Sequence, residues 1–256
     1  MQALELGPGE IQVWICSTEQ LRAERAVEPF ELSESERRRA RRYRFAKHRE
    51  AFELRRGFAH RLLLGYCGPA HTSLELDERC VYCGAAHGKP RLPAGAADWL
   101  RFSWSHSDDR VIYAFANGTD IGVDIERIDP LGDWHGAARQ ALAPEELQRV
   151  EATGATRRAA AFYALWTQKE ALAKALALGL VLPLREIELS ADHDGAPRLI
   201  KTPLGVGSPT DWTLHDLDVA AGFAAAVAVR GPIENLHIAT ESPAAPVMRR
   251  YPPRVC

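Results

Sequence analysis

Two short segments of the chain carry side chains whose types and spacing could do chemistry. The first segment, residues 162–180, is dominated by alanine and leucine and has no helix breaker before Gly179, so we expect one long helix. Four of its side chains recur at the spacings i, i+3, i+4 and i+8: Trp166, Lys169, Glu170 and Lys174. At about 100° per residue they fall within one arc of roughly 140°. That face is too polar for an ordinary core, and the alternative is a solvated face with an ion pair between Glu170 and Lys174.

The second segment, residues 119–128, alternates apolar and polar side chains and predicts a β-strand. Asp124 and Glu126 are two residues apart, so both carboxylates leave the strand on the same side. Gly122 lies on that side too and leaves room for another group to approach the backbone. Two carboxylates this close repel each other unless a cation or a proton intervenes. With Glu170 beside them, they would form an all-oxygen site of the kind that Mg²⁺ prefers.

Together the two segments resemble the paired motif of the 4′-phosphopantetheinyl transferases. The first half reads G-V-D-I-E at residues 122–126, and the second half reads W-x-x-K-E-A-x-x-K at residues 166–174, about forty residues later. The chain length and further matches resemble the double-length, Sfp-type branch, and the likeness runs from about residue 34 to about residue 230. One departure is Ala177, where the family often has a glycine, and it bears on the shape of the helix end.

The resemblance implies a fold that the sequence pattern alone does not specify. Patterning supports an α+β fold with antiparallel hairpins. The resemblance implies two similar α/β halves related by a pseudo-two-fold axis, each with a small, mostly antiparallel sheet and a long helix, and an active site in the cleft between the halves. We divide the chain into an N-terminal half (1–118), a C-terminal half with the metal site (119–230) and a flexible tail (231–256). The tail is inferred from composition, because proline and alanine leave little periodicity there.

The reaction implied by the resemblance is transfer of the 4′-phosphopantetheine arm of coenzyme A, the co-substrate, to a serine of an acyl or peptidyl carrier protein. Adenosine 3′,5′-bisphosphate would be released, and the carrier proteins would be domains of peptide or polyketide synthetases. The metal would be Mg²⁺, with Mn²⁺ as an alternative, held by Asp124, Glu126 and Glu170. Another Mg²⁺-dependent phosphotransferase or hydrolase acting on a nucleotide-like substrate would keep these carboxylates but would need no carrier protein.

The resemblance also implies roles for the other motif residues. Glu170 would take the serine proton, directly or through water, and Lys174 would neutralise charge on the pyrophosphate. Lys169 would share that task or would instead point at a neighbouring carboxylate. The family has an acid near Glu146, close to the metal, although an acid in the first turn of a helix also compensates the helix dipole. Trp166 would pack and position the long helix.

A strongly basic run lies between residues 37 and 49, behind a capping box of Ser33 and Glu36 that opens a helix. Three interpretations are open: a solvated helix balanced by glutamates, a nucleic-acid patch, or a cradle for phosphate, which arginine forks suit. The net charge of −2 argues against a protein that coats nucleic acid. In the resembled family this region meets the 3′-phosphate of coenzyme A, and Arg44 and Arg56 are our candidates for that contact.

Two further stretches match coenzyme-binding segments of the family. Lys89 and Pro90 belong to a GKP turn, which lies against the nucleotide in the family, although a plain polar turn is the alternative. Ser105 and His106 belong to an SHS segment at the end of a predicted strand, where the family binds the phosphates of the coenzyme. No G-x-S-x-G elbow surrounds this serine, so the adjacent Ser-His pair does not indicate a catalytic triad.

Cys80, Cys83 and His87 form a CxxC with a histidine four residues later, a spacing that could hold zinc. A structural zinc needs four ligands, however, and no second pair follows. His71 or Asp77 would complete the set only by chance, so a plain turn is the favoured interpretation.

Turn and strand patterns predict the remaining framework. A first strand at 11–15 is followed by Ser17, which can cap a helix across 19–26. Asn117-Gly118 is a strong two-residue hairpin signal leading into the carboxylate strand. Strands at 186–189, 212–218 and 223–229 would form a second sheet.

The bulk properties of the chain suit a globular enzyme. Its 256 residues, of which 46% are hydrophobic, suffice for a sizeable core. The first residues show no basic segment followed by an apolar run, so we expect no secretory signal, and the longest mostly apolar run, 219–229, is too short to span a bilayer. Five scattered cysteines fit reduced thiols better than a disulfide framework. We therefore expect a monomeric cytoplasmic protein that binds neither nucleic acid nor a membrane.

Overall fold

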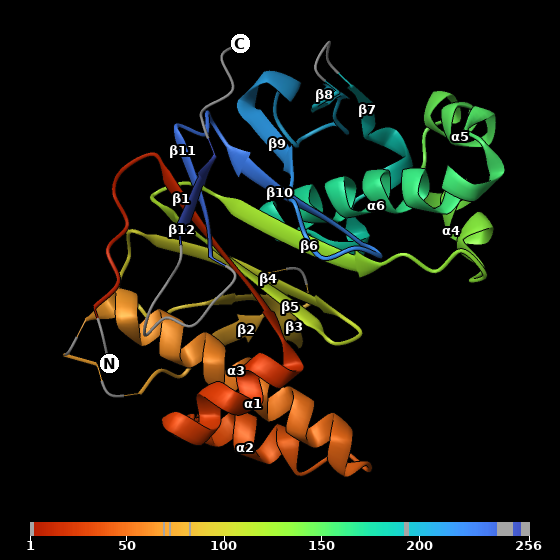
Figure 1. The fold of residues 1–256 in the computed structure, drawn as a ribbon. Helices are drawn as coiled ribbons and strands as arrows, with labels where there is room; N and C mark the ends of the chain where they lie inside the picture. Colours follow the sequence, from red (N-terminus) through yellow and green to blue (C-terminus); the bar gives the residue numbers. More distant parts are fainter. Residues whose placement is uncertain are drawn as a thin grey trace. The chain divides into compact units, whose positions relative to one another are not determined.

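The computed structural model describes residues 3–68, 70–71, 73–81, 83–191, 195–239 and 248–251. The chain forms two compact units, each of which combines helices with small sheets, so the predicted α+β class is confirmed (Figure 1). The first unit is Met1–Arg101, Asp109–Gly118 and Asn235–Cys256, and the second is Phe102–Asp108 and Thr119–Glu234. The chain passes from the first unit to the second after Gly118, where the boundary was predicted. However, residues 102–108 belong to the second unit, although they were predicted in the N-terminal half, and the chain from 235 onward belongs to the first unit, although it was predicted as a separate tail. None of the described helices is both long and apolar enough to cross a membrane.

The first unit is built around a sheet in which β1 has a partner on each side. Its helices and strands, in chain order, are β1 (Glu10–Ser17), α1 (Thr18–Val27), α2 (Glu34–Ala40), α3 (Ala46–Cys67), β2 (Asp77–Arg79), β3 (Ala86–Arg91), β5 (Arg110–Asn117), β11 (Asn235–Ala239) and β12 (Met248–Tyr251). β1 pairs antiparallel with β5 and parallel with β11. Trp14, Phe58 and Tyr113 are fully buried in its core, so β1, α3 and β5 share one apolar interior.

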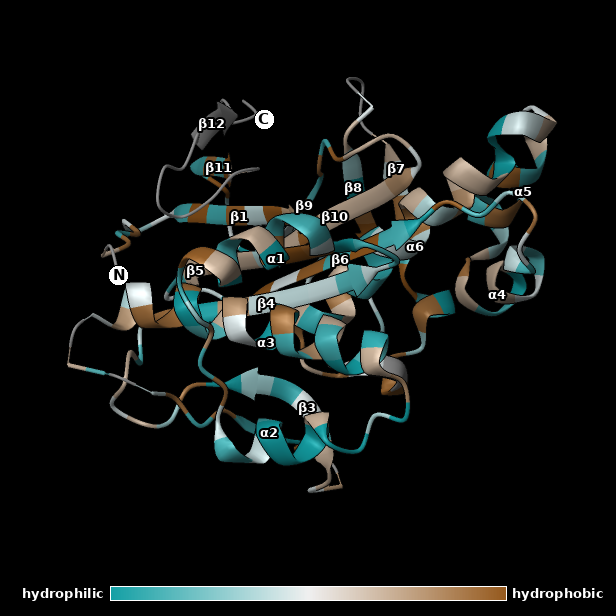
Figure 2. Ribbon diagram, turned by 60° about the horizontal axis from the view of Figure 1, so that its bottom comes forward, coloured by the Kyte–Doolittle hydropathy of each residue, from teal (hydrophilic) through white to brown (hydrophobic). Residues whose placement is uncertain are grey.

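The basic run of the first unit does not form the single helix that the sequence predicts. Both expected N-caps are present: Ser33 forms the predicted capping box with Glu36 at the start of α2, and Ser17 caps α1 in a capping box with Gln20. However, α2 ends at Ala40 and α3 begins only at Ala46. A continuous helix would stack arginines three and four residues apart, which is unfavourable. Figure 2 shows α2 as mostly hydrophilic.

The predicted flexible tail is wrong for residues 235–239. These residues form β11, which pairs with β1 from Glu10 opposite Asn235 to Trp14 opposite Ala239. Leu236 and Ile238 are buried, because β11 covers an edge of β1 that would otherwise leave backbone groups unpaired. β12 extends the same sheet by pairing antiparallel with β11. Residues 240–247 and 252–256 lie outside the described residues.

The second unit combines a three-stranded sheet with one long helix. Its elements are most of β4 (Leu100–Ser107), β6 (Ile121–Arg127), α4 (Trp134–Ala141), α5 (Pro144–Ala152), α6 (Arg158–Ala175), β7 (Glu188–Ala191), β8 (Pro197–Lys201), β9 (Trp212–Asp216) and β10 (Phe223–Arg230), with short 3₁₀ turns at Ala155–Arg157, Gly179–Val181, Leu184–Glu186 and Pro209–Asp211. The sheet order is β6-β10-β9, and β7 pairs with β8 separately. The predicted hairpin at Asn117-Gly118 is wrong: Gly118 does turn the chain with φ 73°, but β6 pairs with β10.

Gly122 explains how α6 comes to lie on β6. A Cβ atom at this position would lie 2.0 Å from the carbonyl oxygen of Ala171 and 2.3 Å from the backbone nitrogen of Ala175. Only glycine therefore permits the observed packing, and the group that approaches the strand backbone is the helix itself. This contact sets the carboxylate side of β6 directly against the C-terminal half of α6.

The end of α6 differs from the predicted helix end near Gly179. The helix stops at Ala175, and Ala177 takes the left-handed φ of 57°. The backbone nitrogen of Leu178 donates to Ala173 and that of Ala177 donates to Lys174, which is the Schellman pattern. Glycine normally occupies the left-handed position, so the chain has alanine where its backbone favours glycine.

We expect Ala177→Gly to raise the free energy of unfolding by about 1 kcal/mol, because it removes the steric cost of a Cβ in left-handed backbone. The measurement is urea unfolding of the variant and the parent protein. Ala160→Gly, at an exposed position within the same helix, is the matched control and should lower stability by about 0.5–1 kcal/mol. Equal losses in both variants would show that Ala177 is not strained.

Candidate active site

Residues from both sequence motifs line one cavity in the second unit. Its volume is about 420 Å³, and its lining comes from β4, β6 and α6. The lining residues are Trp104, Ser105, His106, Asp124, Glu126, Trp166, Glu170 and Lys174. The structure therefore brings together the predicted carboxylates, one of the two predicted lysines and the Ser-His pair.

A short hydrogen-bonded network holds the centre of this cavity. The Lys174 amine donates to Asp124 Oδ1 at 2.5 Å and to the Ser105 hydroxyl at 2.7 Å. Ser105 in turn donates to the same Asp124 oxygen at 2.7 Å. The aspartate is buried, whereas the lysine side chain keeps 29% of its surface exposed. The lysine thus pairs with a buried carboxylate and still reaches the cavity.

Alternate serines of β4 support β6 from the side. Ser103 accepts a hydrogen bond from the backbone nitrogen of Val123, and Ser107 donates to Glu126 Oε2 at 2.7 Å. Ser105 lies between them in the sequence and binds Asp124. Because side chains two apart share one face of a strand, the S-x-S-x-S pattern at 103–107 predicts this arrangement. Our sequence reasoning included only Ser105 and missed Ser103 and Ser107.

The carboxylates of the cavity are arranged as a cation site would require. Burial raises the pKa of Glu126 and Glu170, and the charge of Asp124 raises both further. Among the described residues, the buried oxygens Asp124 Oδ2 and Glu170 Oε1 have no hydrogen-bond partner. Buried carboxylate oxygens without partners are costly unless a cation binds them. The donor set, three carboxylates with two unpaired oxygens, fits Mg²⁺ or Mn²⁺.

Lys169 and Glu146 do not reach this cavity, so their predicted roles at the coenzyme and in catalysis are wrong. Both side chains are completely buried and pair with each other at 2.5 Å. The Lys169 amine also donates to the carbonyl oxygens of Ala141, Leu184 and Ile187. Burial lowers the pKa of Lys169, although the nearby glutamate opposes the shift.

Glu146 is tied into the backbone as well. It accepts from the backbone nitrogen of Ala143 at 2.7 Å, which caps α5, and from that of Leu189 at 2.8 Å. The pair therefore fastens α6 to the start of α5 and to β7. Lys169 stood at one edge of the predicted polar arc, and that edge faces the protein interior. Of the alternatives that the sequence left open for Lys169, the neighbouring carboxylate is confirmed.

Trp166 and His106 complete the lining. Trp166 is half-buried and packs against Phe162 with ring centres 5.7 Å apart, and it also contacts the apolar cluster around Leu172. This supports its predicted role of packing the helix, and one side of the residue still borders the cavity. His106 is exposed at the cavity edge.

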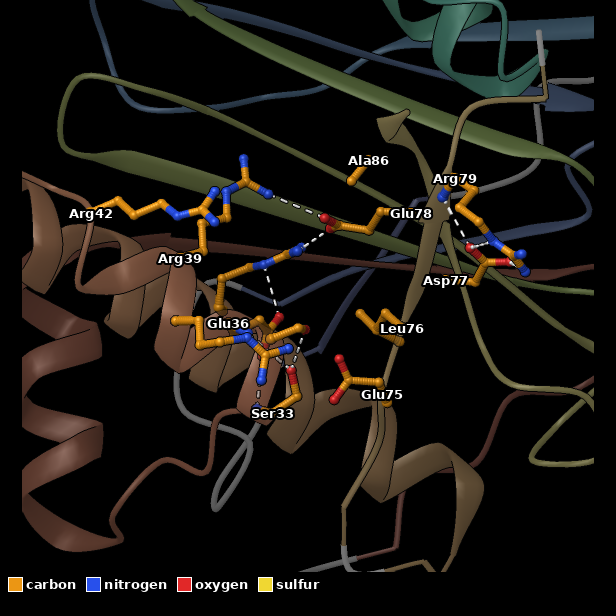
Figure 3. Close-up of a pocket in the computed structure, with 13 residues that line it drawn as sticks. Ser33, Glu36, Arg39, Arg42, Glu75, Leu76, Asp77, Glu78, Arg79 and Ala86 are labelled. Atoms are coloured by element: carbon orange, nitrogen blue, oxygen red, sulfur yellow. Dashed lines mark hydrogen bonds and ion pairs between the residues drawn. The ribbon is translucent and has the colours of Figure 1, made fainter. Parts of the chain in front are cut away.

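The basic residues of the first unit line a separate pocket of about 570 Å³ (Figure 3). Arg56 lies in it but is 7% exposed and forms ion pairs with Glu36 and Glu78, so it is neutralised by carboxylates. Burial by itself would raise the pKa of Glu36, but His60 and Arg56 outweigh it and lower that pKa. In the structure Arg56 thus contacts two carboxylates, and its predicted contact to a phosphate stays a prediction.

Four arginines that line the pocket were not singled out from the sequence: Arg38, Arg39, Arg42 and Arg79. Arg39 pairs with Glu78 at 3.1 Å, and Arg42 lines the pocket without an ion pair to any described residue. Arg44 is exposed and lies over the ring of Phe45, outside the lining. No short-range pattern distinguishes these arginines, because α2 ends inside the basic run.

The GKP segment, residues 88–90, lies within β3 of the β2–β3 hairpin. Lys89 and Pro90 lie within β3 and are half-buried, and only Ala86 of that strand lines the pocket. The predicted polar turn before a strand is thus part of the strand itself.

Comparison with known proteins identifies the family to which these motifs belong. Residues 120–228 match the family model described as ACPS: 4'-phosphopantetheinyl transferase superfamily. The 4'-phosphopantetheinyl transferase HetI of Nostoc sp. (strain PCC 7120 / SAG 25.82 / UTEX 2576) is 29% identical over 231 residues, which are 89% of this chain and 91% of that protein. The 4'-phosphopantetheinyl transferase psf-1 of Bacillus pumilus is 28% identical over 70% of this chain and 75% of its own length.

Another relative matches a shorter part. The 4'-phosphopantetheinyl transferase AcpT of Salmonella typhi is 37% identical over 87 residues, which are 34% of this chain and 44% of that protein. A solved holo-(acyl-carrier-protein) synthase from Bacillus anthracis str. Ames, in complex with CoA (3',5'-ADP), is 23% identical and covers 43% of this chain and 94% of its own, with a TM-score of 0.36. At that TM-score we draw nothing further from the structural likeness.

The region that matches the family model contains the charged residues of the cavity. Asp124, Glu126, Glu170 and Lys174 all fall inside the matched region 120–228, and all four line the same cavity. Residues 120–228 therefore match the 4′-phosphopantetheinyl transferase superfamily, and the chain as a whole is similar to double-length transferases of that superfamily.

Proposed function

We propose that this protein transfers the 4′-phosphopantetheine group of coenzyme A to a serine of an acyl or peptidyl carrier protein, converting the apo carrier to the holo form. The observation that carries the proposal is the network of Lys174, Ser105 and Asp124, with Glu126 and Glu170 in the same cavity. It offers acidic oxygens, an exposed amine and a histidine to one ligand. Such a set suits a polyanion bound together with a metal ion.

The residues that would hold Mg²⁺, or Mn²⁺ in its place, are Asp124, Glu126 and Glu170. The unpaired oxygens on Asp124 and Glu170 support this assignment. A bound ion would neutralise and orient the pyrophosphate of coenzyme A. Ser107 donates a hydrogen bond to Glu126 and would hold this carboxylate in position for the metal ion before coenzyme A binds.

The chain's own residues would carry out the remaining tasks. The carrier serine oxygen attacks the phosphorus that bears pantetheine. The bond between this phosphorus and the oxygen that bridges to the adenosine-side phosphate breaks, and adenosine 3′,5′-bisphosphate leaves with that oxygen. Glu170 would accept the serine proton, directly or through water. Lys174 would donate to the pyrophosphate oxygens from its exposed amine. His106 and Lys89 would meet phosphate groups, and Ser105 would position Lys174 and Asp124.

We assign the 3′-phosphate of coenzyme A to the basic residues of the first unit, with Arg44 and Arg42 as the ligands to test. Arg42 lines the basic pocket, and its guanidinium makes no ion pair with a described residue. A charge-assisted contact to phosphate contributes about 1.5–3 kcal/mol. Arg44→Ala or Arg42→Ala should therefore weaken coenzyme A binding by roughly 10- to 150-fold.

Titration with coenzyme A and dephospho-coenzyme A measures this effect. Dephospho-coenzyme A has no 3′-phosphate, so its affinity should change little in either variant. Arg101→Ala, an exposed arginine outside the pocket lining, is the control and should bind both ligands normally. If neither variant discriminates between the two ligands, the basic run is a solvated face.

The alternative function, a metal-dependent phosphotransferase or hydrolase, differs in its need for a carrier protein. Release of adenosine 3′,5′-bisphosphate, followed by chromatography, should occur only when apo carrier protein is added. A carrier whose modified serine is replaced by alanine should give none. Release without any carrier would favour the hydrolase and overturn the proposal.

The finer identity of the partner and the setting are also proposals. Carrier domains of peptide or polyketide synthetases are the substrates that we propose for a monomeric enzyme. None of the described cysteines forms a disulfide, which suits a reducing compartment such as the cytoplasm.

A further inference from the structure

The tip of the β2–β3 hairpin brings together three side chains that can bind a metal ion. Cys80 follows β2, Cys83 lies in the turn and His87 lies in β3. The ligand atoms of these three residues all lie within 4.8 Å of one another, and Cys83 Sγ is 3.0 Å from His87 Nε2. Sulfur and nitrogen atoms bound to one zinc ion would be separated by less than about 4.5 Å, so small adjustments would suffice.

Backbone hydrogen bonds hold the turn that brings these side chains together. The nitrogen of Cys80 donates to the carbonyl oxygen of Ala85 at 2.8 Å, and that of Gly84 donates to Cys80 at 2.9 Å. Gly84 takes the left-handed φ of 72°, a conformation that glycine adopts without steric cost. Arg79 pairs with Ala86 directly below the turn. The chain is therefore folded back so that both thiols face the histidine.

The chemistry of the three groups selects the ion. Two thiols and an imidazole are soft or intermediate ligands, which zinc prefers and which Mg²⁺ and Ca²⁺ do not. Cys83 and His87 are exposed and Cys80 is half-buried, so water can reach a fourth position. Three protein ligands and a water form the coordination shell of catalytic zinc sites, so an open fourth position is compatible with zinc binding. The lack of a second cysteine pair, which made a plain turn the favoured interpretation of the sequence, is thus no obstacle.

We propose that Cys80, Cys83 and His87 bind one zinc ion, with water as the fourth ligand, and that the ion fastens the hairpin tip. The hairpin matters to the first unit because residues of β2 and Ala86 of β3 form one wall of the basic pocket in Figure 3. Binding releases the two thiol protons and forms two zinc–sulfur bonds and one zinc–nitrogen bond, with no oxidation or reduction. This zinc site rests on the contacts of Cys80, Cys83 and His87 and not on the proposed transferase reaction.

Metal analysis of the purified full chain tests the proposal. We expect about one zinc ion per chain, and near zero in Cys80→Ser and Cys83→Ser, since each removes a thiolate ligand. Cys67→Ser is the matched control, because this half-buried thiol lies outside the site, and it should keep its zinc. Wild type that contains no zinc and binds none on titration, or zinc that persists in both cysteine variants, would overturn the proposal.

A second measurement guards against variants that fail to fold. His87→Gln changes an exposed strand residue, so the chain should fold, while zinc affinity measured against a chromophoric chelator should fall by at least about 10-fold. Hydrogen exchange of wild type with and without zinc should show protection lost at residues 77–91 when zinc is removed. Unchanged affinity in His87→Gln, or exchange that does not respond to zinc in this hairpin, would contradict the site.

Discussion

Replacing Asp124 by alanine should reduce phosphopantetheine transfer by at least about 10³-fold while the protein stays folded. One oxygen of this carboxylate binds Lys174 and Ser105, and the other is buried without a partner among the described residues. The variant therefore loses a metal ligand and releases the amine that would hold the pyrophosphate. Lys174 keeps 29% of its side chain exposed, so water can solvate it after the change.

The measurement is turnover at saturating coenzyme A and carrier protein, accompanied by a thermal unfolding curve. Asp124→Asn is the isosteric partner variant and should be nearly as inactive, because it keeps the shape but not the charge. Asp120→Asn is the matched control: this aspartate precedes the same strand, keeps 46% of its side chain exposed and pairs only loosely with Arg230 at 3.9 Å. If Asp124→Ala keeps near-normal turnover at ordinary Mg²⁺ concentrations, the metal site is assigned to the wrong residues.

Lys169→Met should lower the free energy of unfolding by about 3–5 kcal/mol, because it leaves the fully buried Glu146 carboxylate without its cation. Three backbone carbonyl oxygens also lose the amine that they accept from. The measurement is urea unfolding. It should show the loss of stability directly, without an assay of transfer, because Lys169 has a structural role.

Lys174→Met is the matched control, five residues later on the same helix. Its amine is partly exposed, and after the change the buried Asp124 keeps the hydrogen bond from Ser105, so we expect a smaller stability loss than at Lys169 but a large loss of turnover. The double variant Lys169→Met, Glu146→Gln should recover part of the lost stability, because glutamine removes the buried charge and keeps an oxygen for Ala143 or Leu189. Equal stability losses at Lys169 and Lys174 would contradict the different environments that the structure gives them.

The sequence predicted the cavity residues well because their placement depends on local periodicity. Asp124 and Glu126 share a strand face two residues apart, and Glu170 and Lys174 share a helix face one turn apart. Once Gly122 lets that helix lie on the strand, the two faces must meet. Periodicity could not decide Lys169, because it sits at the edge of the polar arc. Which edge faces the interior depends on α5 and β7, which are distant in the sequence.

Features that depend on distant pairing were predicted less well. Leu236 and Ile238 alternate as a strand does, but the surrounding proline and alanine obscured the signal, and only the free edge of β1 explains β11. Gly118 turns as predicted, yet the strand after it pairs with β10 a hundred residues later in the chain. Likewise, spacing alone could not show that Cys80, Cys83 and His87 converge, because their approach depends on the hydrogen bonds of the turn.

The most direct test of the account is to weigh a carrier protein after incubation with this protein. Apo carrier protein, coenzyme A and Mg²⁺ are mixed with the purified chain, and the intact mass of the carrier is measured. The account predicts a gain equal to one phosphopantetheine group, lost when Mg²⁺ is chelated, when Asp124 is replaced by alanine, or when the carrier serine is replaced by alanine. A carrier whose mass does not change across a panel of acyl and peptidyl carrier proteins, with coenzyme A and Mg²⁺ present, would contradict it.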